Sequence, residues 1–189
     1  MARRRGLGKD DVIAAALEIV DRDGLDALSL KAVADALQVQ SPSLYSHVDG
    51  LPGLLDDLAI DVTADFGETL RDSVVGVSGG VAVAAFAHAY RDWATNNPGR
   101  YELSLRKVAN ADKRVAGRGA IETMDRVLTS FGLTGADATA AGRTLRAALH
   151  GFSTLETADS LGRGRHDASF EYLVEHFVRG VRVGAGRNG

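Results

Sequence analysis

The chain has 189 residues, 45% of them hydrophobic and 25% charged, with three prolines and no cysteine. This composition excludes collagen-like and disordered chains, and the lack of cysteine excludes disulfide-stapled folds and thiolate chemistry. The net charge of −3 is unevenly spread, because Arg3, Arg4, Arg5 and Lys9 stand in the first nine residues without an acid. The remaining residues contain 18 bases against 25 acids.

The basic start of the chain fits two interpretations. It is an arm that grips an anionic polymer, or it is a solvated, frayed terminus. Gly6, Leu7 and Gly8 follow where a secretion signal needs an apolar core, so we expect no signal peptide and a cytoplasmic protein. The most apolar stretch, 81–89, is too short to span a bilayer, which needs about 20 residues. No membrane partner is expected.

Three short helices are predicted in the first fifty residues. Ile13, Leu17 and Val20 recur at helical spacing between Asp10 and Gly24, which predicts a helix of about four turns. Ser29 is an expected N-cap for a second helix that ends near Leu37. Ser41 is an expected N-cap for a third helix, with Pro42 at its first position and Val48 near its end. This order and spacing match a helix-turn-helix.

The rest of the chain is also predicted to be helical. Strand signals are nearly absent, and Asp49-Gly50, the glycines of 74–80 and the segment 96–99 punctuate the helical patterns. The expected helices cover 52–72, 81–96, 100–110, 112–131, 136–159 and 167–183. The prediction is an all-α protein of about nine helices.

The third helix has the composition of a DNA-reading surface. Residues 36–48 contain no charged side chain, and the face away from Leu44 and Val48 offers glutamine, serine, tyrosine and histidine. Such side chains suit base edges, thymine methyl groups and phosphates in a major groove. The alternative is a small polar helix docked on another part of the protein.

Residues 9–66 resemble the DNA-binding domain of the tetracycline-repressor (TetR) family of bacterial transcription regulators. The resemblance rests on Asp23-Gly24 and on the segments LSLKAVADALQV (28–39), QSPSLYSHV (40–48) and GLLDDLA (53–59). It implies a three-helix DNA-binding domain in 1–50, linked by a fourth helix to a helical ligand-binding and dimerisation domain in 51–189. It also implies a homodimeric repressor that a small-molecule effector releases from a palindromic, double-stranded DNA operator.

The resemblance carries functional roles to individual positions. It implies base contacts at the start of the third helix, phosphate or sugar contacts at Tyr45 and His47, and backbone contacts from the second helix. We expect the basic arm to enter a minor groove or lie on phosphates. The expected DNA-binding residues are Arg3, Arg4, Arg5, Ser29, Lys31, Gln40, Ser41, Pro42, Ser43, Tyr45 and His47.

Two positions depart from the family pattern. Gln38 stands where the family usually has a turn glycine, and it tolerates a positive φ poorly. Leu51 stands where a lysine usually opens the fourth helix, so we expect that phosphate contact to be lost. Both keep open an alternative in which the domain no longer reads an operator and acts through partner proteins.

The segments 90–105 and 145–156 resemble the C-terminal domain of a TetR subgroup marked by a His-Gly pair (the WHG type). Here the pair is His150-Gly151, preceded by Leu149 where a tryptophan is frequent. Apolar side chains with polar tips suggest an effector pocket. Its expected lining residues are His88, Trp93, Tyr101, Met124, His150, Phe152 and Glu156. Each of them could instead simply fill the core.

The last two helices are expected to form a four-helix dimer bundle, as the resemblance implies. Small residues allow a close helix approach, and an apolar stripe follows in the last helix. The expected interface residues are Ala147, Gly151, Phe170, Leu173 and Phe177. No metal spacing, cofactor motif or nucleophile is present, so no cofactor and no enzymatic activity are expected. The enzyme alternative would use His150 and Glu156 as an acid–base pair.

Overall fold

The computed structural model describes residues 7–108, 115–162 and 164–185, with side chains through residue 182. Within these ranges every regular element is a helix, which confirms the predicted all-α class. The chain divides into two compact units. The first comprises 1–63 with 97–113, and the second 64–96 with 114–189.

The first unit begins with the predicted short helices. Gly8 precedes the first of them, and its N–H donates to Asp11 Oδ2 at 2.8 Å, which satisfies a donor at the start of the helix. Ser29 caps the second helix as predicted, with its Oγ accepting from the N–H of Ala32 at 3.1 Å. The elements in order are α1 (Lys9–Asp23), η1 (Leu25–Ala27), α2 (Leu30–Leu37), η2 (Ser41–Ser46) and the first part of α3 (Gly50–Ser73).

A later helix, α5 (Pro98–Leu105), returns to this unit and packs on α1. A Cβ on Gly99 would lie 2.7 Å from Val20 Cγ1 and 3.0 Å from the Val20 carbonyl oxygen, so only glycine permits this approach. Arg100 then donates from Nε and Nη2 to the two carboxylate oxygens of Asp21, at 2.8 and 2.6 Å. Arg106 Nε donates to Asp56 Oδ1 at 2.9 Å.

The predicted boundary at residue 50 coincides with the start of α3, whereas the compact units divide after residue 63. The first unit continues to residue 63 and takes up 97–113. The division crosses α3, because this helix runs without a break from Gly50 to Ser73. The contacts of α5 with α1 join residues far apart in the chain, so a local sequence pattern could not predict them.

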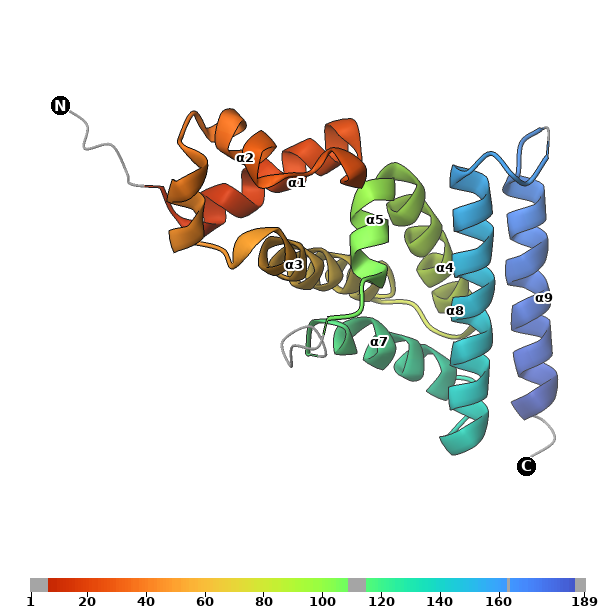
Figure 1. Cartoon of the computed structure of the whole chain (residues 1–189). Coiled ribbons are helices and arrows are strands. Elements are labelled where there is room, and N and C mark those ends of the chain that lie inside the picture. The colour runs from red at the N-terminus through yellow and green to blue at the C-terminus, as the bar shows by residue number, and fades with distance from the viewer. Residues whose placement is uncertain (1–6, 109–114, 163, 186–189) are drawn as a thin grey trace. The chain divides into compact units, whose positions relative to one another are not determined.

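The second unit contains the rest of α3 and four further described helices. Figure 1 shows α8 and α9 side by side and antiparallel, joined by the loop that precedes α9. Buried aromatic rings hold α4 to α3: Phe66 stacks on Trp93 at 4.5 Å between ring centroids and meets Tyr90 edge-on at 5.0 Å. The four helices are α4 (Gly79–Asn96), α7 (Arg118–Thr129), α8 (Gly135–Thr157) and α9 (Asp167–Ala185).

A half-buried ion cluster ties α4 to α8 and to the start of α9. Arg91 donates from Nε to Glu156 Oε2 at 2.7 Å, from Nη2 to Glu156 Oε1, and from Nη2 to Asp167 Oδ1 at 3.0 Å. Its guanidinium carbon also lies 4.8 Å from the ring centroid of Phe170 and 5.6 Å from that of Phe152. The side chains of Arg91 and Glu156 are only 13% and 18% exposed, so solvent screens this pair weakly.

We expect Glu156→Gln to remove a pH-dependent part of the stability. The hydrogen bonds from Arg91 lower the pKa of Glu156 in the folded state. A carboxyl group of this kind stabilises the fold above its unfolded pKa of about 4.3, and the contribution is lost as pH falls through the folded pKa. In urea unfolding, wild type should exceed the variant by about 1–2 kcal/mol at pH 7, with a smaller gap at about pH 3.

Glu68→Gln, at an exposed position of α3, is the control and should show no such gap at either pH. A gap for Glu156→Gln that stays constant with pH would show that the charge of Glu156 does not stabilise the fold.

Candidate nucleic-acid interface

The turn between α2 and η2 keeps a left-handed residue without a glycine. Gln38 adopts φ 56° and ψ 40°. Its N–H donates to the Asp35 carbonyl oxygen at 3.2 Å, and the Val39 N–H donates to the Ala34 carbonyl oxygen at 3.0 Å. These bonds close the end of α2 in the manner of a glycine-ended helix. The departure at Gln38 therefore leaves the turn conformation in place, at a local cost of about 1–2 kcal/mol.

The third helix of the motif differs from its prediction. It is a 3₁₀ helix, Ser41–Ser46, and the residue before it is Gln40, so Ser41 lies inside the helix and is not its N-cap. The Ser43 N–H donates to the Gln40 carbonyl oxygen at 2.9 Å, and Ser46 Oγ donates to the Ser43 carbonyl oxygen at 2.9 Å. The His47 N–H likewise donates to the carbonyl oxygen three residues back, on Leu44, at 2.9 Å, as in a 3₁₀ helix.

The three-residue period of η2 sorts its side chains into rows. Ser41, Leu44 and His47 share one row, in which Leu44 is completely buried and the other two are half-buried. The other two rows hold exposed residues. They are Pro42, Ser43, Tyr45 and Ser46. The outward surface thus presents two hydroxymethyl groups, a proline ring and a tyrosine that is 63% exposed.

Three further predicted DNA-binding residues lie in the described part of the chain: Gln40, Ser29 and Lys31. Gln40 is exposed, and the Oγ of Ser29 accepts the capping hydrogen bond of α2. Lys31 is 85% exposed, with its Nζ 3.7 Å from Asp35 Oδ2. Such an exposed pair is weak, so the ammonium can exchange this carboxylate for a phosphate.

One of the positive charges at the start of the chain forms an ion pair within the first unit. Lys9 Nζ lies 2.8 Å from Asp57 Oδ1, which neutralises one of the four bases counted in the basic arm. The three arginines predicted to contact DNA, Arg3, Arg4 and Arg5, lie outside the described residues. Leu51 is half-buried in the first turn of α3 and adds no charge there.

The predicted effector-pocket residues belong to both compact units. Tyr101 is buried in the first unit, whereas Trp93 is buried in the second, with its Nε1 donating to Asp65 Oδ2 at 3.1 Å. Met124 is also buried in the second unit. His88 Nε2 lies 3.1 Å from Glu171 Oε1. Each of these side chains therefore has a packing or pairing role within its own unit.

The predicted pocket residues of α8 are likewise engaged. Phe152 meets Phe170 edge-on at 5.1 Å, and Glu156 is held by Arg91. His150 Nδ1 lies 3.4 Å from Thr154 Oγ1. His150 and Glu156 are six residues apart on one helix, so they project from different faces and do not form an acid–base pair.

Ser153 is a buried polar residue that was not predicted from the sequence. It is 1% exposed, and its Oγ has no hydrogen-bond partner among the described residues. The sequence pattern that could have predicted its burial is the four-residue spacing after Leu145 and Leu149, which are also buried. Among the described residues no cluster of three or more metal-ligating side chains occurs, and no helix is long and apolar enough to cross a membrane.

The predicted dimer residues fall into two groups. Phe170, which was expected in the interface, is completely buried inside its own chain, against Phe152 and His88. Leu173 and Phe177 are half-buried. On α8, Ala147 is exposed and a Cβ on Gly151 would meet no atom within 4 Å.

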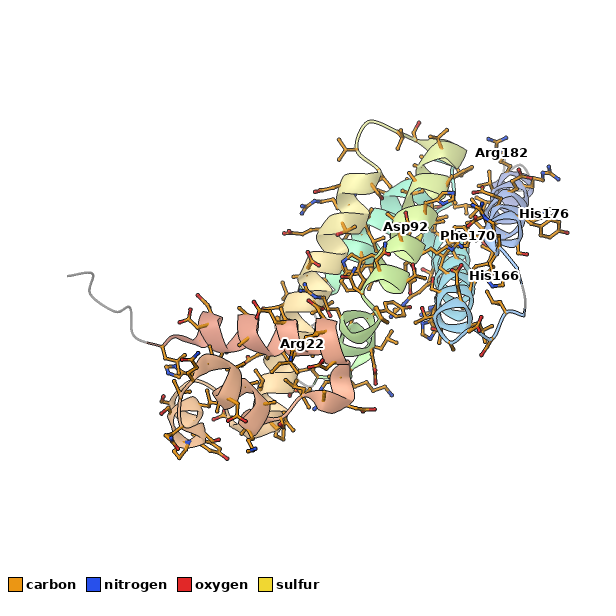
Figure 2. All side chains as sticks on the ribbon, turned by 90° about the horizontal axis from the view of Figure 1, so that it is seen from above. Arg22, Asp92, His166, Phe170, His176 and Arg182 are labelled. Carbon is orange, nitrogen blue, oxygen red and sulfur yellow. The ribbon has the colours of Figure 1, made fainter. Side chains whose placement is uncertain are left out.

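Figure 2 shows Phe170 on the inner side of α9 and His176 on its outer side. His176 stacks on Tyr172 at 3.7 Å between ring centroids, and both are exposed. The outer faces of α8 and α9 in the single chain therefore carry small and aromatic side chains.

Relatives of this chain are regulators of transcription. Residues 83–177 match the family described as the tetracyclin repressor-like C-terminal domain. The uncharacterized HTH-type transcriptional regulator YobS of Bacillus subtilis is 32% identical over 186 residues, 97% of each chain. A second uncharacterized HTH-type regulator, from Mycobacterium tuberculosis, is 35% identical over 96% of this chain and 84% of its own. The class D tetracycline repressor of Escherichia coli is 40% identical over 58 residues, 31% of this chain and 27% of its own.

Solved structures share the fold. A protein of unknown function from Rhodococcus sp. RHA1 has a TM-score of 0.82 at 23% identity, covering 95% of this chain and 98% of its own. ActR of Streptomyces coelicolor bound to actinorhodin has a TM-score of 0.72 at 21% identity, covering 96% and 100%. BioQ with its double-stranded DNA operator has a TM-score of 0.68 at 24% identity, covering 94% and 99%.

We expect Gln38→Gly to stabilise the protein. Glycine adopts the left-handed conformation without the side-chain penalty, and Gln38 is exposed, so no buried contact is lost. After the entropy cost of glycine, the free energy of unfolding should rise by up to about 1 kcal/mol. Gln38→Val should lower it, because a β-branched residue tolerates positive φ worst. Denaturant titrations of the three proteins compare these values, and a less stable glycine variant would contradict the strain argument.

Proposed function

Because the chain belongs to the TetR family of transcription regulators, we propose that it is a repressor that a small-molecule effector releases from a palindromic operator. One observation carries the DNA-binding part. The outward rows of η2 present Ser43, Tyr45 and Ser46 on a surface without charge, while Leu44 anchors the element. Short hydroxyl side chains and an aromatic ring suit base edges and the phosphate backbone.

DNA binding is proposed to require a homodimer. A single element of six residues reads few base pairs, and two copies related by a two-fold axis read two half-sites about 34–36 Å apart. We assign the contact to the outer faces of α8 and α9, with Ala147 and Gly151 at the close approach and Leu173 and Phe177 beside them. Phe170 supports this face from within the protomer.

The effector is proposed to act on the second unit. It must bind one arrangement of the DNA-reading units better than the other, because a ligand with equal affinity for both shifts nothing. The chain passes between the units three times: within the continuous α3, at Asn97 between α4 and α5, and between residues 113 and 114. Support comes from ActR, a protein of the same fold that was solved with actinorhodin.

The proposal includes no enzymatic activity. Arg91 lowers the pKa of Glu156, which disfavours the protonated form that a general acid needs at neutral pH. The alternative of a regulator that no longer reads an operator rested on Gln38 and Leu51. The left-handed conformation of Gln38 weakens the argument from Gln38, so that alternative now rests on Leu51.

We expect Tyr45→Ala and Lys31→Ala to weaken operator binding without unfolding the protein, because both side chains are exposed. Gel shifts against DNA that flanks the gene measure the affinity, and circular dichroism checks the helix content. Lys107→Ala, an exposed lysine after α5, is the matched control and should bind like wild type. Ser43→Ala should instead change base preference, by about 1–3 kcal/mol for a good contact. Native affinity in the Tyr45 variant would remove η2 from the DNA interface.

We expect Phe177→Asp to disrupt the dimer and, with it, specific DNA binding. A carboxylate placed in the proposed interface would be buried without a partner, which is strongly unfavourable. Sedimentation measures the oligomeric state of the variant. Glu175→Gln, at a neighbouring exposed position, is the control. A Phe177→Asp dimer of native affinity would place the interface elsewhere.

A further inference from the structure

An open hollow lies in the second unit, between the C-terminal end of α3, the start of α4 and the C-terminal end of α7. Its volume is about 460 Å³, within the range of small-molecule sites, about 300–1,000 Å³. None of the residues that the sequence analysis expected to line an effector pocket borders it.

Apolar side chains line most of the hollow. Four valines and Ala82 border it; Val127 and Ala82 are buried, whereas Val75 and Val77 are exposed at the rim. Ser130 joins two of its walls, because its Oγ accepts from the Gly79 N–H at 3.1 Å and donates to the Val127 carbonyl oxygen at 2.6 Å. The hollow therefore offers an apolar surface held between α7 and the start of α4.

Positive charge is concentrated on the same lining. Arg71 and Arg126 both border the hollow, and no lining residue is acidic. Arg126 is held along α7, with Nε donating to the Glu122 carbonyl oxygen and Nη2 to Thr123 Oγ1, both at 3.3 Å. Arg71 Nε donates to Asp72 Oδ1 at 3.2 Å, an exposed contact between adjacent residues. Two guanidinium groups beside one apolar surface match an oxyanion attached to an apolar body.

We propose that this hollow binds an anionic amphiphile, a molecule with an apolar body and a carboxylate or phosphate head group. The body lies on the valines, and the head group accepts hydrogen bonds from Arg71 and Arg126. We further propose that this molecule is the effector, a step that rests on the proposed function. A concave site favours a single molecule over a flat membrane surface.

The test uses the full chain and four probes: decanoate, decyl phosphate, decanol and inorganic phosphate. Isothermal titration calorimetry, with each amphiphile below its micelle-forming concentration, should detect binding of decanoate or decyl phosphate. Comparison of these two identifies the preferred head group. Decanol should bind at least about tenfold more weakly, because it lacks the charge, and inorganic phosphate should bind weakly, because it lacks the apolar body.

Three variants test the residues. Arg71→Gln and Arg126→Gln should each weaken binding of the preferred anion about tenfold or more, with little effect on decanol. Val77→Asp should also weaken it, because a carboxylate at the rim repels the head group. Arg118→Gln, an exposed arginine of α7 that does not border the hollow, is the matched control and should bind like wild type. All four positions are exposed, so the variants should fold, and circular dichroism checks this.

Several outcomes would overturn the site: no binding of either anion, equal binding of decanol, or unchanged affinity in both arginine variants. Binding only to anionic phospholipid vesicles would overturn it in favour of a membrane surface. The regulatory step is measured separately, as release of operator DNA by the bound anion. Binding without release overturns the effector role alone, and absence of operator binding in ligand-free protein overturns the proposed function while the calorimetry still decides the site.

Discussion

The burial of Leu44 is the constraint on which the DNA-reading surface depends. In a helix with three residues per turn, one buried residue determines which row faces inward, and here that row also contains Ser41 and His47. Within Ser41–Ser46, the residues of the other two rows are exposed. The exposed set of Pro42, Ser43, Tyr45 and Ser46 thus follows from one apolar contact and the helix period. An α-helical period would have distributed the same side chains over different faces.

In the second unit a charged side chain, together with the apolar core, holds three helices together. Arg91 draws Glu156 and Asp167 together and lies over the rings of Phe152 and Phe170, so that α4, α8 and α9 meet around one guanidinium. Breaking such a half-buried pair leaves a charge without compensation, which makes the arrangement sensitive to any single substitution. The cluster also engages Phe152 and Glu156, which the sequence analysis had expected to meet an effector.

Polar-tipped residues serve packing and pairing here, whereas the ligand site that we propose is the open hollow. Polar tips on apolar bodies are typical of ligand pockets, but the same feature allows a side chain to pack and pair inside a helical bundle. Trp93 illustrates the second case, since it stacks on Phe66 and donates to Asp65. The open hollow is bordered by valines, serines and two arginines. These residues come from separate parts of the chain, so no local sequence pattern predicts the site.

Local sequence features were sufficient to predict the all-helical class, the ends of α1 and α2, the cap at Ser29 and the buried positions Leu44 and Val48. These depend on periodicity and on hydrogen bonds between residues a few positions apart, which a linear sequence displays directly. The return of α5 to α1, the burial of Phe170 and the site of the hollow were decided only by the tertiary structure. Each of them depends on contacts between segments distant in the chain, or on the space left between fixed elements. A local pattern contains neither kind of information.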